Sequence, residues 1–358
     1  MKNKIIIAVL IISFLIIGLS ISFACKKEKQ NKATIVDNEP PVIELKGNNI
    51  LLMVGDTYLE PGYNAFDNYD GNITSKVVVS GNVDTNKAGV YKLEYTVQDS
   101  SNNKFEIERV ITVCEDNVDS VPILTYHNFM SEKEKSQFAP KDKYTVTIES
   151  FEKQLQYLKE NGYKTITLDD FYMWYTNQIA LTEKDVVMVI DDGNISQYHY
   201  AIPLIEKYGF NATIFVITGR ITNNDVEWDP SQLQFFNQNI IDDIENNHKS
   251  IKLESHTNNL HQLIDNQVAI KVKTDEEIEN DLKISKEILD ASYLAYPYGW
   301  NTASSTEILK KLGYKMAFAF GQGNYGRASK TDDQYYIKRV NITAETSMRE
   351  FVNWLEER

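Results

Sequence analysis

The chain has 358 residues, and its 37 Lys and Arg stand against 51 Asp and Glu, which gives a formal net charge of −14. A hydrophobic fraction of 42% with 21 Tyr and 15 Phe excludes a disordered chain, and the acidic balance argues against a nucleic-acid-binding protein. Two cysteines are too few for a disulfide scaffold. The length predicts two or three domains with ample core.

The N-terminus has the layout of an export signal. Two lysines precede residues 5–24, a stretch without a charge, as in secretory signal peptides, and the run is also long enough to span a bilayer. The four residues ending at Cys25 (SFAC) resemble the bacterial lipoprotein signal, with Ser22 where such signals usually have Leu. We therefore predict a signal peptide or membrane anchor over 1–24 and a polar linker over 25–38, and we expect the rest of the chain at the cell surface.

Residues 39–115 are predicted to form a small all-β domain. Expected strands lie at 42–45, 50–54, 77–80, 91–97 and 105–113, a spacing typical of an antiparallel sandwich. The order of its turns resembles the bacterial immunoglobulin-like domains of surface proteins. The acidic run at 67–71 fails as an EF-hand loop because Phe66 stands at the first ligand position, so we predict a plain turn there.

From residue 120 to 358 the pattern changes to strands alternating with helices. Expected strands lie at 121–126, 164–168, 185–190, 212–217 and 251–254, and a helix at 196–208. Thr274 and Ser347 each begin a capping box that opens a helix. This alternation predicts an α/β parallel sheet or barrel with functional groups on the loops after the strands.

Two adjacent carboxylates follow the most apolar of these strands. Val186–Ile190 is a continuous apolar run that ends in Asp191 and Asp192, as expected for a strand buried on both faces. Paired carboxylates beside a core strand are costly unless their charge is offset. A metal ion would offset it, and an Asp that caps the next helix is the alternative.

Two of the five histidines, His256 and His261, lie directly after the strand at 251–254. Neutral imidazole and carboxylate are the usual ligands of a catalytic zinc that keeps one position open. Asp, His and His therefore form a chemically sensible ligand set. The pattern predicts a metal centre at the ends of these strands.

Two further segments carry groups of possible use in catalysis. Residues 294–299 (LAYPYG) form a Pro- and Gly-containing loop whose backbone N–H groups could face a developing oxyanion. The strand at 121–126 ends at His127, either a proton donor or a buried histidine satisfied by hydrogen bonds.

Together these segments resemble the polysaccharide deacetylase family, carbohydrate esterases of the NodB-homology type. VVMVIDDG at 186–193 is similar to the TFDDG motif, ESHTNNLH at 254–261 to the histidine motif, and LAYPYG to an arginine-proline motif that lacks its arginine. ILTYHNF at 123–129 resembles the opening strand of the branch that deacetylates poly-β-1,6-N-acetylglucosamine. The resemblance implies a distorted (β/α) barrel from about residue 121 to the C-terminus, behind the small immunoglobulin-like sandwich.

The resemblance also implies roles for particular residues. Asp192, His256 and His261 would hold a divalent metal ion, expected to be Zn²⁺. Asp191 would be the general base toward the attacking water, and the backbone N–H of Tyr298 would help to hold the oxyanion.

Two positions depart from the family pattern. The histidine that most members place near the C-terminus is missing, because no histidine follows His261, so His127 is the expected general acid. The arginine that orients the base is replaced by Ala295, and Arg339 is our candidate to take its place.

The sequence thus predicts an exported, membrane-tethered, metal-dependent hydrolase that removes acetyl groups from N-acetylglucosamine polymers. Peptidoglycan, chitin-type oligomers or an O-acetylated polysaccharide are alternative substrates. A glycan-binding surface protein with a degenerate catalytic domain is the alternative outside enzymes. Expected partners are an N-acetylated polysaccharide and, through a lipid or N-terminal anchor, the membrane, with no nucleic acid.

Overall fold

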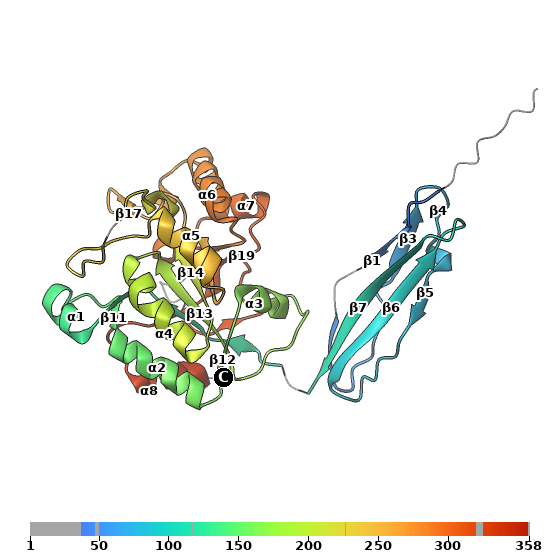
Figure 1. Cartoon of the computed structure of the whole chain (residues 1–358), viewed down its shortest axis with the longest axis horizontal. Coiled ribbons are helices and arrows are strands. Elements are labelled where there is room, and N and C mark those ends of the chain that lie inside the picture. The colour runs from blue at the N-terminus through green and yellow to red at the C-terminus, as the bar shows by residue number, and fades with distance from the viewer. Residues whose placement is uncertain (1–36, 47–49, 116, 226, 320–324, 357–358) are drawn as a thin grey trace, which may run out of the picture.

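The computed structural model describes residues 37–46, 50–115, 117–225, 227–319 and 325–356. The predicted signal peptide or anchor, and all but the last two residues of the predicted linker, lie outside this range. Within it, no helix has the length and apolar character needed to cross a membrane. Figure 1 shows a slender β-rich body followed by a larger body of strands and helices.

The first body is a two-sheet sandwich. One sheet has the order β1 (Val42–Leu45), β3 (Tyr63–Asp67), β4 (Gly71–Asn72). The other has the order β2 (Ile50–Met53), β7 (Lys104–Cys114), β6 (Gly89–Gln98), β5 (Val78–Ser80). Alternate residues face the space between the sheets, as period-2 strands require, and Ile43, Tyr95 and Ile111 are among those buried there.

The sandwich departs from the sequence prediction in two places. Strand β3 was missed because its residues, YNAFD, follow Gly62 and lead into the turn before Gly71, and their polar side chains, Asn64 and Asp67, do not alternate with apolar ones. Strand β2 pairs parallel with β7, so the sandwich is not purely antiparallel. A parallel partner lies far away in sequence, and local turn patterns therefore do not reveal it.

The second body is the predicted distorted barrel. Its parallel strands follow the order β21 (Ile337–Lys338), β19 (Met316–Ala319), β18 (Tyr293–Ala295), β15 (Ile251–Ser255), β14 (Ala212–Val216), β13 (Asp185–Asp192), β9 (Ile123–Tyr126), β22 (Val340–Asn341). Arg339 alone separates β21 from β22 along the chain. This short segment therefore joins the two edges of the sheet and closes the ring.

Helices surround the barrel (Figure 1). They are α1 (Glu132–Phe138), α2 (Ile148–Glu160), α3 (Leu168–Tyr175), α4 (Ile202–Tyr208), α5 (Gln238–Asn247), α6 (Asp275–Leu289), α7 (Ala303–Lys311) and α8 (Met348–Glu356). Short strands complete the body: β8 (Ser120–Val121), β10 (Asn128–Met130), β11 (Thr145–Thr147), β12 (Lys164–Ile166), β16 (Leu263–Ile264), β17 (Gln267–Val268) and β20 (Ala328–Ser329).

Local capping explains where several helices begin. The predicted capping boxes are confirmed, since Thr274 exchanges hydrogen bonds with Glu277 and Ser347 does so with Glu350. Strand β12 is shorter than predicted because Thr167 already caps α3. The helix expected at 196–208 starts with a π-helical turn, Gln197–Ala201, before α4.

Strand β13 shows how the core directs one candidate site residue inward. Val186, Met188 and Ile190 pack in the outer cluster formed with the surrounding helices. Val187 and Val189 belong instead to the inner cluster, which contains side chains from several barrel strands. Because successive strand residues alternate between faces, the next inward position is residue 191.

Glu254 on β15 gives the barrel a predicted pH-dependent stability. Burial raises the pKa of this carboxyl to about 7, against the lowering effect of the N–H groups of Ser292 and Tyr293, which it accepts at 2.8 Å each. The folded state then holds a proton that the unfolded state, with its pKa near 4.5, has already lost. Stability therefore falls as the pH rises between these two values.

Replacing Glu254 by Gln is expected to remove this loss, because the amide oxygen still accepts both N–H groups and carries no charge. The variant should gain about 2–3 kcal/mol over the native chain at about pH 8 and almost nothing at about pH 4. Urea unfolding of the barrel at both pH values measures the difference. Glu245→Gln, at an exposed position on α5, is the matched control. Equal pH slopes in all three proteins would contradict the assignment.

Candidate active site

All predicted site residues except Arg339 line one pocket at the carboxyl ends of the barrel strands. It has a volume of about 270 Å³. Its walls are His127, Asn128, Asp142, Tyr144, Asp191, Asp192, Asn194, Leu233, His256, His261 and Tyr298. These residues end β13, begin β10, follow β9, β15 or β18, or lie on the intervening loops. Parallel strands present their carboxyl ends on one side, which explains why residues so distant in sequence converge.

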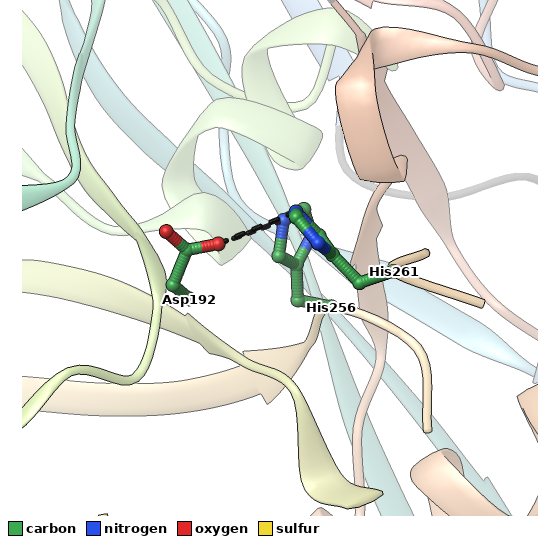
Figure 2. A group of neighbouring side chains, drawn as sticks. All are labelled: Asp192, His256 and His261. Atoms are coloured by element: carbon green, nitrogen blue, oxygen red, sulfur yellow. Dashed lines mark ion pairs between the residues drawn. The ribbon is translucent and has the colours of Figure 1, made fainter. Parts of the chain in front are cut away.

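Asp192, His256 and His261 point toward one another (Figure 2). The Oδ1 atom of Asp192 lies 3.4 Å from Nε2 of His261 and 3.6 Å from Nε2 of His256. One ligand atom from each residue lies within 4.8 Å of the other two. This is the spacing expected of side chains that share one ion.

The hydrogen bonds around these residues leave the atoms that face one another free to bind a metal ion. Nδ1 of His256 lies 2.7 Å from the carbonyl oxygen of Ala295, so this nitrogen carries the proton and Nε2 offers a lone pair. Oδ1 of Asp192 is buried and has no hydrogen-bond partner among the described residues. Two imidazole nitrogens and one carboxylate oxygen are a donor set that suits zinc with an open position. The residues present therefore fit a divalent metal ion.

The backbone is strained at two places beside this cluster. Asp192 has a φ of 86° and Thr257, which follows His256, has a φ of 68°. Non-glycine residues rarely adopt this left-handed region, and such strain persists where the surrounding structure holds it. In both segments the unusual turn directs a polar side chain into the pocket rather than continuing the strand.

Asp191 and Arg339 form a buried ion pair. The guanidinium donates from Nη1 to Oδ1 at 2.8 Å and from Nη2 to Oδ2 at 2.9 Å, and the side chains are 1% and 0% exposed. Burial alone would raise the pKa of Asp191, but the charge and hydrogen bonds of Arg339, together with the nearby His256 and His127, hold the pKa at about 2. The carboxylate is therefore ionised and fixed in orientation. Arg339 reaches it from the segment that closes the barrel.

His127 and Tyr298 line the same pocket as these carboxylates. Nε2 of His127 is 3.9 Å from Oδ2 of Asp191, and burial lowers the pKa of its imidazole. Tyr298 has a φ of 56°, and its ring centroid lies 4.5 Å from that of His261. The structure thus brings every predicted site residue to the pocket or into direct contact with a residue that lines it.

One buried residue that connects the backbones of Asp191 and His127 was not predicted from the sequence. Gln197, in the π-helical turn, donates from Nε2 to the carbonyl oxygens of Asp191 at 2.5 Å and of His127 at 2.8 Å. It is fully buried. A single glutamine six residues after the aspartates carries no recognisable pattern, although π-helical turns are common at functional sites.

The outer wall of the pocket was also missed. Tyr144 and Leu233 are 36% and 64% exposed and border the pocket together with Asn128 and Asp142. These side chains lie on segments whose position depends on the folded barrel, so no spacing rule points to them. An exposed aromatic and an exposed aliphatic side chain beside polar groups suit the apolar face and the hydroxyls of a sugar.

Two separate segments of the chain match known protein families. Residues 43–113 match the family described as bacterial surface protein, Ig-like domain, and residues 178–317 match the polysaccharide deacetylase family. The chain is 28% identical over 211 residues to the poly-beta-1,6-N-acetyl-D-glucosamine N-deacetylase of Staphylococcus aureus, covering 56% of this chain and 68% of that protein.

Two solved structures share the fold. The Streptococcus pyogenes deacetylase PplD in complex with acetate superposes with a TM-score of 0.56 at 24% identity, covering 67% of this chain and all of that one. IcaB from Ammonifex degensii gives a TM-score of 0.55 at 23% identity, covering 67% and 98%. These structures show the fold. The family matches identify a polysaccharide deacetylase domain at residues 178–317, whose relatives indicate a hydrolase of carbon–nitrogen bonds, preceded by a bacterial surface immunoglobulin-like domain at residues 43–113.

Proposed function

We propose that this protein is a cell-surface, metal-dependent N-deacetylase of N-acetylglucosamine polymers of the poly-β-1,6-linked kind. The observation that carries the proposal is that Asp191, held by Arg339, lines the same pocket as Asp192, His256 and His261. Sequence similarity to the Staphylococcus aureus enzyme favours this substrate over peptidoglycan. The export signal and Cys25 in the sequence support attachment to the outer face of the membrane.

Asp192, His256 and His261 would hold the metal ion. A divalent ion at this place supplies Lewis-acid activation of water and of the acetamide carbonyl. The Nδ1–H bond from His256 to the carbonyl of Ala295 keeps that imidazole in the tautomer and orientation that a ligand needs. Ala295 stands where the family usually has arginine, and here its backbone carbonyl accepts the bond from His256.

Asp191 acts as the base. Its ionised carboxylate takes a proton from the water that attacks the acetamide carbon, while Arg339 keeps both oxygens in place through two parallel hydrogen bonds. The backbone N–H of Tyr298 stabilises the oxyanion that forms on the carbonyl oxygen. Because the pair is shielded from water, its orientation needs no rearrangement during the reaction.

His127 acts as the acid. The C–N bond breaks when the sugar nitrogen receives a proton, because an unprotonated amine leaves poorly. Nε2 of His127 lies 3.9 Å from Oδ2 of Asp191, so the acid and the base face the same reacting centre, and a water molecule between them would return the proton taken by Asp191 to the imidazole. Gln197 holds the backbone of both residues and thereby sets this separation. The products are acetate and a free glucosamine.

Acetate release by the chain lacking residues 1–25 tests the proposal. We expect release from poly-β-1,6-N-acetylglucosamine and at least about tenfold slower release from peptidoglycan, because a discrimination of this size needs only about 1.4 kcal/mol of transition-state binding. Faster release from peptidoglycan would assign that substrate class instead. A folded, zinc-loaded protein that releases acetate from neither polymer would contradict the proposed function.

A further inference from the structure

Three aspartates of the immunoglobulin-like domain gather at one point, far along the chain from the deacetylase motifs. Asp37 precedes β1, Asp67 ends β3, and Asp99 lies in the turn between β6 and β7. One carboxylate oxygen of each lies within 4.8 Å of the other two. The residues are 8%, 7% and 6% exposed, respectively, so these carboxylates are largely removed from water.

The local hydrogen bonds use only part of these carboxylates. Oδ1 of each aspartate accepts backbone N–H groups from residues two to four positions further along the chain. Oδ2 of Asp99 accepts the amide of Asn103 at 2.7 Å. Oδ2 of Asp37 and Oδ2 of Asp67 are buried and have no hydrogen-bond partner among the described residues. Two buried carboxylate oxygens of this cluster therefore lack the hydrogen-bond partner that buried polar atoms normally have.

Their charge is not neutralised by a side chain either. In the part of the chain that the structure describes, no Lys, Arg or His forms an ion pair with Asp37, Asp67 or Asp99. Lys76, which lies nearby, pairs with Asp70 at 3.0 Å. Three buried carboxylates without a cation would repel one another and would be strongly destabilising. The arrangement calls for a bound cation.

We propose that Asp37, Asp67 and Asp99 form a calcium site. All available ligand atoms are oxygens. Zinc prefers nitrogen and sulfur ligands, whereas Ca²⁺ and Mg²⁺ prefer oxygen, so the ligand set favours Ca²⁺ or Mg²⁺. The backbone carbonyls of Asp37 and Glu39 both accept the amide of Asn103, at 3.3 and 3.2 Å, so carbonyl oxygens lie at the same corner. Ca²⁺ accepts such irregular sets of carboxylate and carbonyl oxygens, whereas Mg²⁺ demands a near-ideal octahedron.

The site would fasten the beginning of the domain to two of its turns. Asp37 enters from the side of the predicted polar linker, while Asp67 and Asp99 belong to turns in different sheets. A shared ion would therefore tie the incoming chain to both sheets at once. At a cell surface, where calcium is abundant, this would stiffen the connection between the anchor and the folded domains.

Calcium titration of the full chain in detergent tests the site directly. The native protein should bind Ca²⁺ with a dissociation constant of about 1 mM or below, as extracellular modules do, and binding should persist in His261→Ala. Asp67→Asn keeps the Oδ1 acceptor of the turn and removes one charge, so it should weaken binding at least about tenfold. Glu44→Gln, at an exposed position on β1, should leave binding unchanged. A native protein that binds no Ca²⁺, or binding equal in Asp67→Asn, would overturn the proposal.

Thermal unfolding separates ion binding from a merely structural role. Calcium should raise the melting temperature of the immunoglobulin-like domain in the native chain, relative to chelator, and should not raise it in Asp67→Asn or Asp99→Asn. In chelator the variants should melt no lower than the native chain, because one repelling charge is gone. Equal melting of the native chain in calcium and chelator would overturn the site. Variants that melt lower by the same amount in both solutions would also overturn it.

Discussion

Replacing Asp191 by Asn is expected to lower kcat for acetate release by about 10³-fold, within the range that a general base contributes. Asparagine has nearly the same shape, and its oxygen still accepts one N–H group of Arg339, but it cannot take a proton from water. The pocket and its glycan contacts remain, so KM should change little. Steady-state kinetics on poly-β-1,6-N-acetylglucosamine measure both constants.

The matched control for this experiment is the metal content. Asp191 lies beside the proposed ligands but points to Arg339, so the variant should bind zinc in the same ratio as the native chain. Asp192→Asn, one residue further on, should lose zinc as well as activity. A native kcat in Asp191→Asn would remove this residue from the role of base. Loss of zinc in Asp191→Asn would instead make it a metal ligand.

Replacing Arg339 by Met is expected to cost about 3–5 kcal/mol of folding free energy, because it leaves the carboxylate of Asp191 buried without its partner. The same change should abolish measurable turnover, since the carboxylate loses the two hydrogen bonds that fix its orientation. Urea unfolding of the barrel and acetate release measure the two effects. Arg349→Met, at an exposed position on α8, should change neither by much.

A double-mutant cycle distinguishes the buried pair from simple loss of packing. Asp191→Asn combined with Arg339→Met removes both charges, so the double variant should recover about 1–3 kcal/mol over Arg339→Met alone while staying inactive. Arg339→Lys keeps one positive charge but loses the paired N–H groups, and should recover more stability than activity. Strictly additive losses of unfolding free energy would show that the Asp191–Arg339 ion pair does not contribute to the stability of the barrel.

The sequence alone was sufficient to predict the candidate site residues that lie at the ends of strands. An apolar run ending in Asp191 and Asp192, and a second strand ending in His256, carry both the fold pattern and the chemistry, because a parallel sheet brings its carboxyl ends together. Resemblance to a known family added the order of the motifs. The structure confirms the barrel, and it brings Arg339 to Asp191 although they are 148 residues apart.

Other features depend on tertiary contacts that no local pattern encodes. The closure of the ring through β21 and β22 is built from two strands of two residues each, too short for any periodicity. Gln197 acts through the backbone carbonyls of the nearby Asp191 and the distant His127. The acidic run near Asp67 looked like a plain turn because the other two members of its cluster come from elsewhere in the chain.

The central claim, that Asp192, His256 and His261 hold a metal ion needed for deacetylation, is tested most directly by removing the metal. After treatment of the chain lacking residues 1–25 with chelator, acetate release should fall by about 100-fold or more, since the lost charge stabilisation amounts to several kcal/mol. Added zinc should restore it in the native chain and in His248→Ala, whose imidazole pairs with Glu206 and Asp243 away from the pocket, but not in His261→Ala. Undiminished acetate release from metal-free protein would contradict the account.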